Sequence, residues 1–273
     1  MDAALRVFGR LATASDAEID LGAAALAVAQ IEHPTLVPDE HLHRLDGLAT
    51  LSAADTGPPR RRLERLVSFL FDEQGFRGNA DHYYDPRNSC LNDVLDRRLG
   101  IPITLSVLTI EVGRRVGLSI AGVGLPGHFI VAAEAGGERR YLDPFNGGAT
   151  LSEDAAAEVA SRAVGRPVRL ESEHWTPCSK RQIVIRMLRN LKTSYAREQR
   201  WDRALAAVDR LLAVDPEAPT HFRDRGTVLV RLGRLHEGAA EWERYLSRSP
   251  AAQDAETFRQ ELRRVRQELG SRN

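Results

Sequence analysis

The sequence has 273 residues, 42% of them hydrophobic and 28% charged, so it can bury a sizeable core and is not a disordered chain. Lysine plus arginine and aspartate plus glutamate number 38 each, which gives no reason to expect nucleic acid or an anionic membrane as a partner. No stretch has the roughly 20 apolar residues of a bilayer-spanning helix, and the N-terminus lacks a secretion signal. We expect a cytoplasmic protein with two domains, or one large domain and an appendage.

The N-terminal third has the spacing of amphipathic helices. Asp20 precedes a helical run that Pro34 stops, and a second helix is expected after Pro38. Apolar residues from Leu63 to Phe71 then recur at helical spacing, and Gly75 provides a stop.

The middle of the chain predicts two more helices. Ser89 ends a turn cluster and is a good N-cap for a helix over about Cys90–Arg98. The run from Ile103 to Val116 is apolar on nearly all sides, as in a helix buried inside a domain.

After Gly117 the period changes to that of strands. Gly136-Gly137 is a hairpin signal between two apolar segments. The pattern predicts strands over 118–123, 128–133 and 139–142, a helix from Ser152 to about Val164, and a further strand over 167–170. Helices followed by a small antiparallel sheet make an α+β core.

From Ile183 onward the sequence repeats. Pro216 and Pro250 lie 34 residues apart, and so do Ala204 and Gly238, which is the tetratricopeptide period. Two helical hairpins and a charged capping helix over about 255–269 follow from this pattern. The domain division is 1–178, with a helical part over 1–75 and a core over 76–178, then repeats over 179–273.

The repeat alignment places one set of side chains on the concave surface of the repeats. The predicted partner-binding residues are Arg186, Arg189, Thr193, Arg223 and Thr227. Three arginines favour an acidic peptide or a protein C-terminus, bound through charge-assisted hydrogen bonds. Lys192 departs from the pattern, because a small residue is expected at its position.

One histidine and one aspartate are brought together by the predicted hairpin. If the turn is centred between Gly136 and Gly137, His128 faces residue 145 and Asp143 is its diagonal neighbour on the same face. A histidine oriented by a carboxylate is the base half of a nucleophilic triad. The spacing also fits a structural histidine and an Asp-Pro turn.

Two longer runs carry a family resemblance. The segment YYDPRNSCLNDVLDRRLGIPITLSVLTIEVGRRVGLSIAGVGLPGHFIV and the later YLDPFNGG resemble the bacterial SirB-one family, most specifically in GIPITLS, GLPGHF and LDPF. The resemblance covers the chain from about Asp16 to the end of the repeats. It implies a transglutaminase-like domain with a papain-like core, followed by tetratricopeptide repeats. It also matches His128 and Asp143 to the base and orienting acid of the transglutaminase-like superfamily.

The nucleophile of that superfamily is missing here. Its Gly-x-Cys motif falls on Gly100-Ile101-Pro102. Proline carries no nucleophilic atom and cannot offer the backbone N–H that often serves an oxyanion hole. Acyl transfer through a thiolate at this position is therefore excluded.

Three other residues are candidate substitute nucleophiles. Thr104 and Ser106 lie near the start of the buried helix, although such hydroxyls commonly bond a helix carbonyl instead. Cys90 lies 12 residues before the matched position, and the alternative is a buried structural cysteine. A further set is expected to support the pocket by capping helix N–H groups or shaping a turn: Asn88, Ser89, Asn92 and Gly127.

No cofactor or metal is expected. The two cysteines, Cys90 and Cys178, form no CxxC pair, which argues against a disulfide scaffold and a structural zinc site. His41 and His43 are two residues apart and would point to different faces of a helix. No phosphate-binding glycine loop is present.

Three hypotheses on function follow. The first is a non-catalytic regulatory or scaffold protein that binds a protein partner through its repeats and a degenerate pocket. The second is a divergent hydrolase or acyltransferase that uses His128 and Asp143 with a substitute nucleophile. In the third, the core is purely structural and the repeats alone bind the partner.

Overall fold

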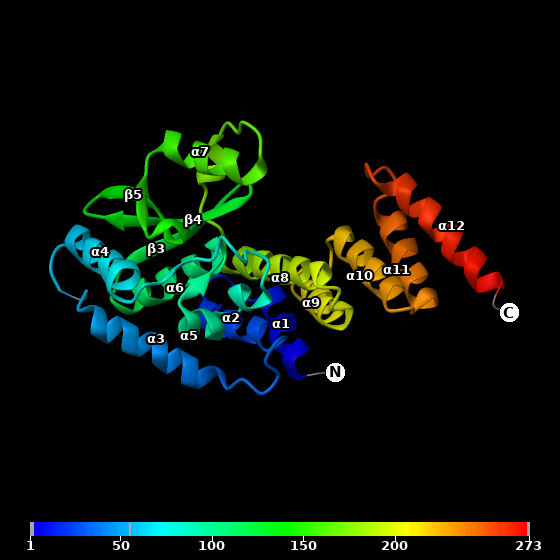
Figure 1. The fold of residues 1–273 in the computed structure, drawn as a ribbon, viewed down its shortest axis with the longest axis horizontal. Helices are drawn as coiled ribbons and strands as arrows, with labels where there is room; N and C mark the ends of the chain where they lie inside the picture. Colours follow the sequence, from blue (N-terminus) through cyan, green and yellow to red (C-terminus); the bar gives the residue numbers. More distant parts are fainter. Residues whose placement is uncertain (1–2, 55, 272–273) are drawn as a thin grey trace. The chain divides into compact units, whose positions relative to one another are not determined.

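The computed structural model describes residues 3–54 and 56–271, which form two compact units (Figure 1). The core unit is Ser15–Met187, and the repeat unit combines residues 3–14 with 188–271. The boundary between them falls within α8 (Lys180–Arg197). The sequence-based division after residue 178 stays a prediction.

Helices form the first part of the core unit. They are α2 (Leu21–Ala29), α3 (Pro38–Ser52) and α4 (Pro59–Val67). The carboxylate of Asp20 caps α2 by accepting a hydrogen bond from the backbone N–H of Ala23 at 2.9 Å. Beyond α4 the chain continues as a π-helix over Ser68–Glu73, where three successive apolar side chains are buried, and the left-handed Gly75 follows. The sequence predicted a regular helix here.

The two helices expected in the middle of the chain are present. They are α5 (Leu91–Arg97) and α6 (Pro102–Arg115), and α6 is buried along nearly its whole length, as predicted. The expected cap of α5 is wrong. Residues Pro86–Ser89 form a 3₁₀ turn, so Cys90 is the N-cap and Ser89 lies before it. Two short strands, β1 (Arg77–Gly78) and β2 (Leu99–Gly100), pair in parallel beside this turn.

A four-stranded antiparallel sheet completes the core unit. Its strands are β3 (Ser119–Leu125), β4 (His128–Ala135), β5 (Glu138–Asp143) and β6 (Ala149–Leu151), in sequential order. Val131 lies opposite Leu142, which is the predicted hairpin register. The strand expected over 167–170 is wrong: that segment is irregular, and β6 takes the edge position.

Helices cover both faces of this sheet. In Figure 1 the strands lie between α6 and α7 (Glu153–Val164), and both helices contact β4. Ser152 caps α7, as predicted, through a hydrogen bond from the N–H of Ala155. Under α7, apolar residues of β3 and β4 pack with Ala156 and Ala160 into a buried cluster.

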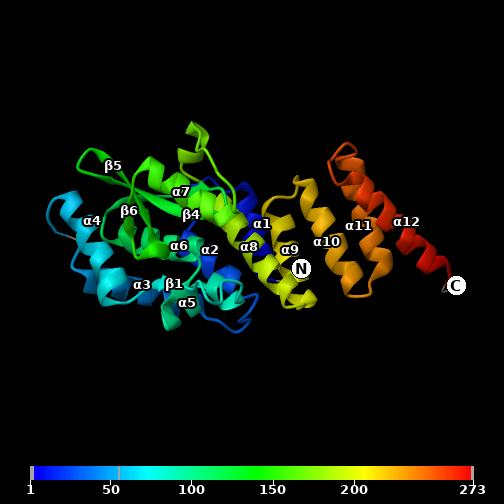
Figure 2. The ribbon, with the colours of Figure 1, turned by 45° about the horizontal axis from the view of Figure 1, so that its top comes forward.

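The repeat unit is a succession of helices (Figure 2). After α8 come α9 (Trp201–Val214), α10 (Pro219–Arg231), α11 (Leu235–Arg248) and α12 (Ala255–Ser271), each contacting the next within this unit from α9 onward. The N-terminal α1 (Ala3–Thr13) also belongs here, because it packs on α9, where the guanidinium of Arg210 lies 5.6 Å from the ring centroid of Phe8.

Small residues let the helices of the second hairpin approach closely, as predicted. A Cβ atom added at Gly226 would lie 2.9 Å from the carbonyl oxygen of Gly238, and one at Gly238 equally close to that of Gly226. The first hairpin tolerates Lys192 at its small-residue position because the ammonium group extends to an ion pair with Asp224 of α10.

Candidate functional site

The predicted contact between His128 and Asp143 is confirmed. Nε2 of His128 lies 2.9 Å from Oδ2 of Asp143, and both side chains are buried. A tight turn through Pro126 and Gly127 delivers His128 to the start of β4, opposite Leu125. Gly127 is left-handed, with φ of 68°, and a Cβ there would lie 2.9 Å from side-chain atoms of Ala163 and Val164. The expected need for glycine at this turn is confirmed.

Hydrogen bonds keep the buried carboxylate of Asp143 charged. Burial acts to raise its pKa, but hydrogen bonds from His128 and Asn146 outweigh burial, so the pKa lies below its ordinary value. Oδ1 accepts the backbone N–H groups of Phe145 and Asn146, and Oδ2 accepts the side-chain amide of Asn146 at 2.7 Å. The aspartate therefore orients His128 and also builds the turn that follows β5.

An aromatic ring packs against the imidazole. The ring of Phe145 meets His128 edge to face, with centroids 5.9 Å apart, and meets Tyr83 at 6.1 Å. Arg186 donates hydrogen bonds to the backbone oxygens of His128 and Leu125. These neighbours fix the position of the histidine and reduce its access to water.

The start of α6 holds no nucleophile at the matched position. Pro102 is the first residue of the helix, after Ile101. The hydroxyl of Thr104 donates to the backbone oxygen of Asn88 at 2.6 Å, and the N–H of Ile101 reaches the same oxygen at 3.4 Å. Thr104 thus anchors α6 to the preceding turn rather than bonding His128.

Asn88 is a structural hub beside this helix start. Its side-chain amide donates to the backbone oxygens of His82 and Tyr83, and its Oδ1 accepts from Asn79. The expectation that Asn88 and Ser89 cap helix N–H groups is wrong, because Asn88 organises the loop that carries Tyr83. Asn88 therefore holds together the loop that carries Tyr83, and its support of a pocket stays a prediction.

The other hydroxyl and amide candidates form no catalytic contact. The oxygens Ser106 Oγ, Ser89 Oγ and Asn92 Oδ1 are buried and have no hydrogen-bond partner among the described residues. Ser106 in particular does not bond the imidazole of His128. Cys178 is a poor thiolate, because burial raises the pKa of its thiol against weaker opposite effects of Gly124 and Arg186.

Cys90 lies beside a different histidine, His33, which was not among the residues predicted for a site. Its sulfur and donor atoms of His33 and Asp93 all lie within 4.8 Å of one another, and Nε2 of His33 is 2.7 Å from Oδ2 of Asp93. Cys90 and Asp93 are three residues apart, which the sequence could have signalled. His33 is 57 residues from Cys90 along the chain, and no local pattern connects them.

The five predicted partner-binding residues lie on two helices, Arg186, Arg189 and Thr193 on α8 and Arg223 and Thr227 on α10. Arg186 is engaged within the core unit, where it donates to the backbone oxygens of Leu125 and His128. Arg223 is paired with Asp224 and Asp254 of its own unit. Thr193 and Thr227 each donate to a backbone oxygen one helical turn back. Of the set, Arg189 and Thr193 are exposed.

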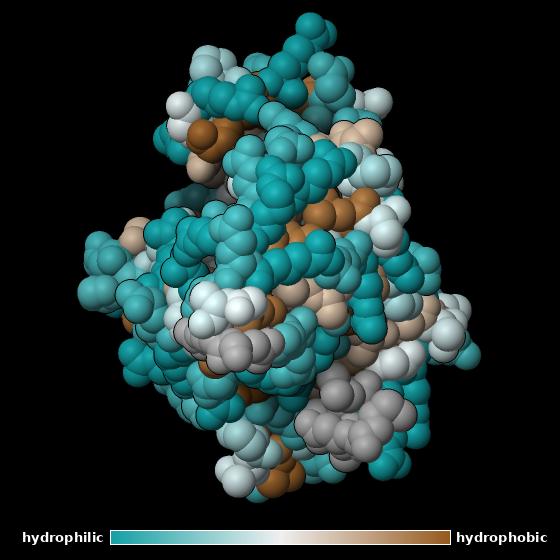
Figure 3. Space-filling model, turned by 90° about the vertical axis from the view of Figure 1, so that its right-hand side faces the viewer, coloured by the Kyte–Doolittle hydropathy of each residue, from teal (hydrophilic) through white to brown (hydrophobic). Residues whose placement is uncertain are grey.

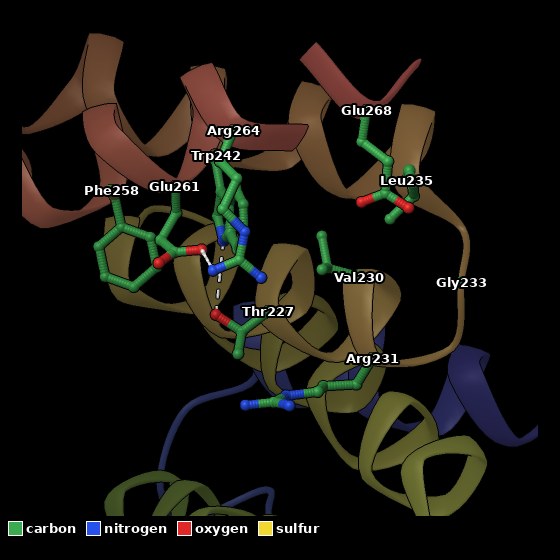
Figure 4. A pocket seen from close by; sticks show the side chains of 10 residues that line it. All are labelled: Thr227, Val230, Arg231, Gly233, Leu235, Trp242, Phe258, Glu261, Arg264 and Glu268. Carbon is green, nitrogen blue, oxygen red and sulfur yellow. Dashed lines mark hydrogen bonds and ion pairs between the residues drawn. The ribbon is translucent and has the colours of Figure 1, made fainter. Parts of the chain in front are cut away.

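A groove in the repeat unit includes one of the predicted residues, Thr227. It has a volume of about 590 Å³ and runs between α10, α11 and α12 (Figure 4). Thr227 and Trp242 lie at its wall, joined by a hydrogen bond of 3.4 Å. Charged residues of both signs line it: Arg231, Arg264, Glu261 and Glu268. The face shown in Figure 3 is mostly hydrophilic, with apolar residues in small separate areas.

Comparison with known proteins identifies both parts of the chain. The sequence pattern of the transglutaminase-like superfamily matches residues 39–189, and that of the tetratricopeptide repeat matches 191–263. A UPF0162 protein of Xylella fastidiosa is 36% identical over 271 residues, covering 94% of each chain. The chain belongs to the SirB1/UPF0162 family. Protein SirB1 of Salmonella typhimurium is 24% identical over 237 residues, covering 86% of this chain and 88% of its own.

Membership of the SirB1/UPF0162 family confirms the resemblance and the α+β core with following repeats that were predicted from the sequence. A UPF0162 protein of Vibrio cholerae is 29% identical over 222 residues, covering 81% of this chain and 82% of its own. No solved structure matches the chain. Within the described residues, no helix combines the length and apolar character needed to cross a membrane.

Proposed function

We propose that this SirB1/UPF0162 protein is a non-catalytic scaffold or regulatory protein of the cytoplasm. Its repeats bind a segment of a partner protein, and the degenerate pocket around Pro102, His128 and Asp143 contributes to recognition without chemistry. The observation that carries the proposal is the proline at the nucleophile position of an otherwise assembled histidine–aspartate pair. Tetratricopeptide repeats in general mediate protein interactions, which supports the choice of partner.

The neighbours of Pro102 support the absence of catalysis. A base activates a nucleophile only when the two groups are within hydrogen-bond reach. Thr104 donates its hydroxyl hydrogen to the backbone oxygen of Asn88, and the buried hydroxyl of Ser106 has no hydrogen-bond partner within the described part of the chain. The pair of His128 and Asp143 is then a structural element with nothing to activate.

The groove of the repeat unit is the proposed binding surface. Arg264 pairs with Glu261 only at 3.6 Å, so its guanidinium can turn to an acidic group of a bound segment. Arg231 lies 5.7 Å above the ring of Trp201, which holds a second cation at the wall. Because Glu261 and Glu268 oppose these cations and the groove is confined to one hairpin and the capping helix, we expect modest affinity for a polar segment with an acidic group.

The groove is tested with two charge reversals on the same helix. Proteins captured by the immobilised full chain are compared for wild type, Arg264→Glu and the control Arg266→Glu, which pairs with Glu243. We expect a captured partner to bind the wild type and the control alike and Arg264→Glu at least about tenfold more weakly, as for loss of a charge-assisted bond of about 1.5–3 kcal/mol. A partner that binds both variants equally well contradicts the groove.

The competing function is a divergent hydrolase or acyltransferase, which the 2.9 Å contact of His128 with Asp143 favours. It is tested by incubating the wild type and His128→Ala with a fluorophosphonate and with iodoacetamide, and mapping the labelled residues by mass spectrometry. We expect no label whose formation depends on His128. Labelling of Thr104, Ser106 or Cys90 in the wild type, lost in His128→Ala, overturns the non-catalytic proposal.

A further inference from the structure

We propose that Cys90, His33 and Asp93 form a binding site for a divalent transition-metal ion, with zinc as the best match. The donor atoms of these three side chains lie within 4.8 Å of one another. Thiolate sulfur, imidazole nitrogen and carboxylate oxygen are the ligands that zinc takes in proteins, at roughly 2.0–2.3 Å. Small side-chain movements therefore bring all three onto one ion.

The ligands come from two segments that are already fixed. Cys90 caps α5 and Asp93 lies in its first turn, so their side chains leave the helix start on the same side. His33 follows α2, where its N–H donates to the oxygen of Ala29 and its own oxygen accepts from Leu36, both at 3.0 Å. Neither segment must rearrange to present its donors.

Charge balance favours a divalent cation in this place. Cys90 is fully buried and Asp93 is 9% exposed. In the metal-free protein the Cys90 thiol donates to the backbone oxygen of Pro86 at 3.5 Å, and Asp93 pairs with His33. Metal binding would release the thiol proton, and the resulting thiolate beside the Asp93 carboxylate would require a counter-charge in such buried surroundings. A divalent ion neutralises one thiolate and one carboxylate, while His33 coordinates as a neutral ligand.

The burial of Cys90 also favours a role as a metal ligand over a role as a catalytic nucleophile. Cysteine, histidine and aspartate would equally compose a catalytic triad, but a substrate cannot reach a sulfur atom that is 0% exposed. The His33 side chain is 36% exposed, which leaves a path for an ion and for water as a fourth ligand. Three protein ligands and an open position are the arrangement of zinc sites that bind an exogenous molecule.

This proposal departs from the absence of a metal expected from the sequence. That expectation rested on the missing CxxC pair, and a mixed set of one cysteine, one histidine and one aspartate leaves no such signature. The proposal is independent of the binding function of the repeats, since all three ligands belong to the core unit.

Cobalt(II) titration of the reduced full-length protein tests the site, because cobalt bound to thiolate absorbs in the near ultraviolet. We expect the band in the wild type and in the control Cys178→Ser, its loss in Cys90→Ser, and its displacement by zinc. His33→Gln and Asp93→Asn are expected to weaken cobalt binding at least about tenfold. Circular dichroism checks that each variant is folded.

Thermal unfolding provides a second readout that does not depend on cobalt absorption. Added zinc is expected to raise the thermal unfolding midpoint of the wild type and of Cys178→Ser, and to leave that of Cys90→Ser unchanged, because a ligand that binds only the folded state stabilises it. The proposal is overturned if the wild type binds neither ion, or if folded Cys90→Ser, His33→Gln and Asp93→Asn bind cobalt as tightly as the wild type.

Discussion

A wholly buried carboxylate is stable only when its oxygens receive enough hydrogen bonds to replace water. Asp143 meets this condition with donors from three residues, namely His128, Phe145 and Asn146. One of these donors is a ring and the others belong to the turn after β5. The aspartate thus has a structural role that does not depend on catalysis.

Replacing the carboxylate of Asp143 should lower the free energy of unfolding substantially. Asp143→Ala leaves buried N–H groups of Phe145 and Asn146 without an acceptor, so we expect the free energy of unfolding to fall by about 3 kcal/mol. The control Glu138→Ala removes an exposed carboxylate from the other end of β5 and should change it by less than about 0.5 kcal/mol. Urea denaturation measures both. Equal losses of unfolding free energy in the two variants would show that the hydrogen bonds of Asp143 do not stabilise the fold.

Single-residue expectations succeeded where the geometry is local. The contact of His128 with Asp143 follows from the two-residue alternation of strands and a turn whose centre the glycines mark. The bond of Thr104 to Asn88 and the approach of His33 to Cys90 join separate segments. Such contacts depend on how elements pack, which periodicity does not encode.

At the scale of elements, the crossing of α10 and α11 depends on the absence of side chains. At Gly226 the backbone of α11 and the indole of Trp242 occupy the space that a methyl group would need. The indole in turn donates to the backbone oxygen of Arg223 at 3.2 Å, so it cannot move without loss of that bond. Close packing and one hydrogen bond therefore fix the same contact.

Replacing glycine with alanine inside a helix usually stabilises a protein, but Gly226→Ala should destabilise this one. A Cβ there would lie 2.4 Å from Cδ1 of Trp242, so we expect a loss of about 1–3 kcal/mol in the free energy of unfolding. The control Gly9→Ala, in α1 of the same unit, meets nothing within 4 Å and should gain about 0.5–1 kcal/mol. Thermal or urea unfolding measures both variants. A stabilised Gly226→Ala would contradict the crossing.

Elements with a strong period were predicted well, and short or irregular ones were not. The helices over 102–115 and 153–164 and the hairpin of β4 and β5 agree with the sequence pattern. The fourth strand was misplaced because three residues, Ala149–Leu151, carry too little periodicity to be recognised, while Val168 and Leu170 are apolar since they pack on the cluster beneath α7. The packing of α1 against α9 in the repeat unit could not be predicted, because no local sequence pattern indicates a contact between segments so far apart in the chain.

At the scale of the whole molecule, the two units carry buried ionisable groups that respond to acid in different ranges. In the core unit the pKa of Asp143 is lowered, so its contribution to stability is present above the unfolded pKa of about 3.9 and is lost as pH falls through the folded value. In the repeat unit burial lowers the pKa of His221, against an opposite effect of Asp215. The unfolded chain then takes up the proton first, so stability falls as pH drops below about 6.5.

Mild acid should therefore lower the folding stability through protonation of His221, at a higher pH than the range in which Asp143 is protonated. We expect the thermal unfolding midpoint of the wild type to fall between pH 7 and pH 5.5, and the fall to be smaller in His221→Gln, which has no imidazole to protonate. The control His236→Gln replaces an exposed histidine of α11 and should keep the wild-type dependence on pH. Because His221→Gln also loses the 3.2 Å contact with Asp215, its midpoint is expected to be lower at both pH values, and only the difference between them is diagnostic. An undiminished difference would mean that the imidazole is protonated in the folded protein as readily as in the unfolded chain, contrary to its burial.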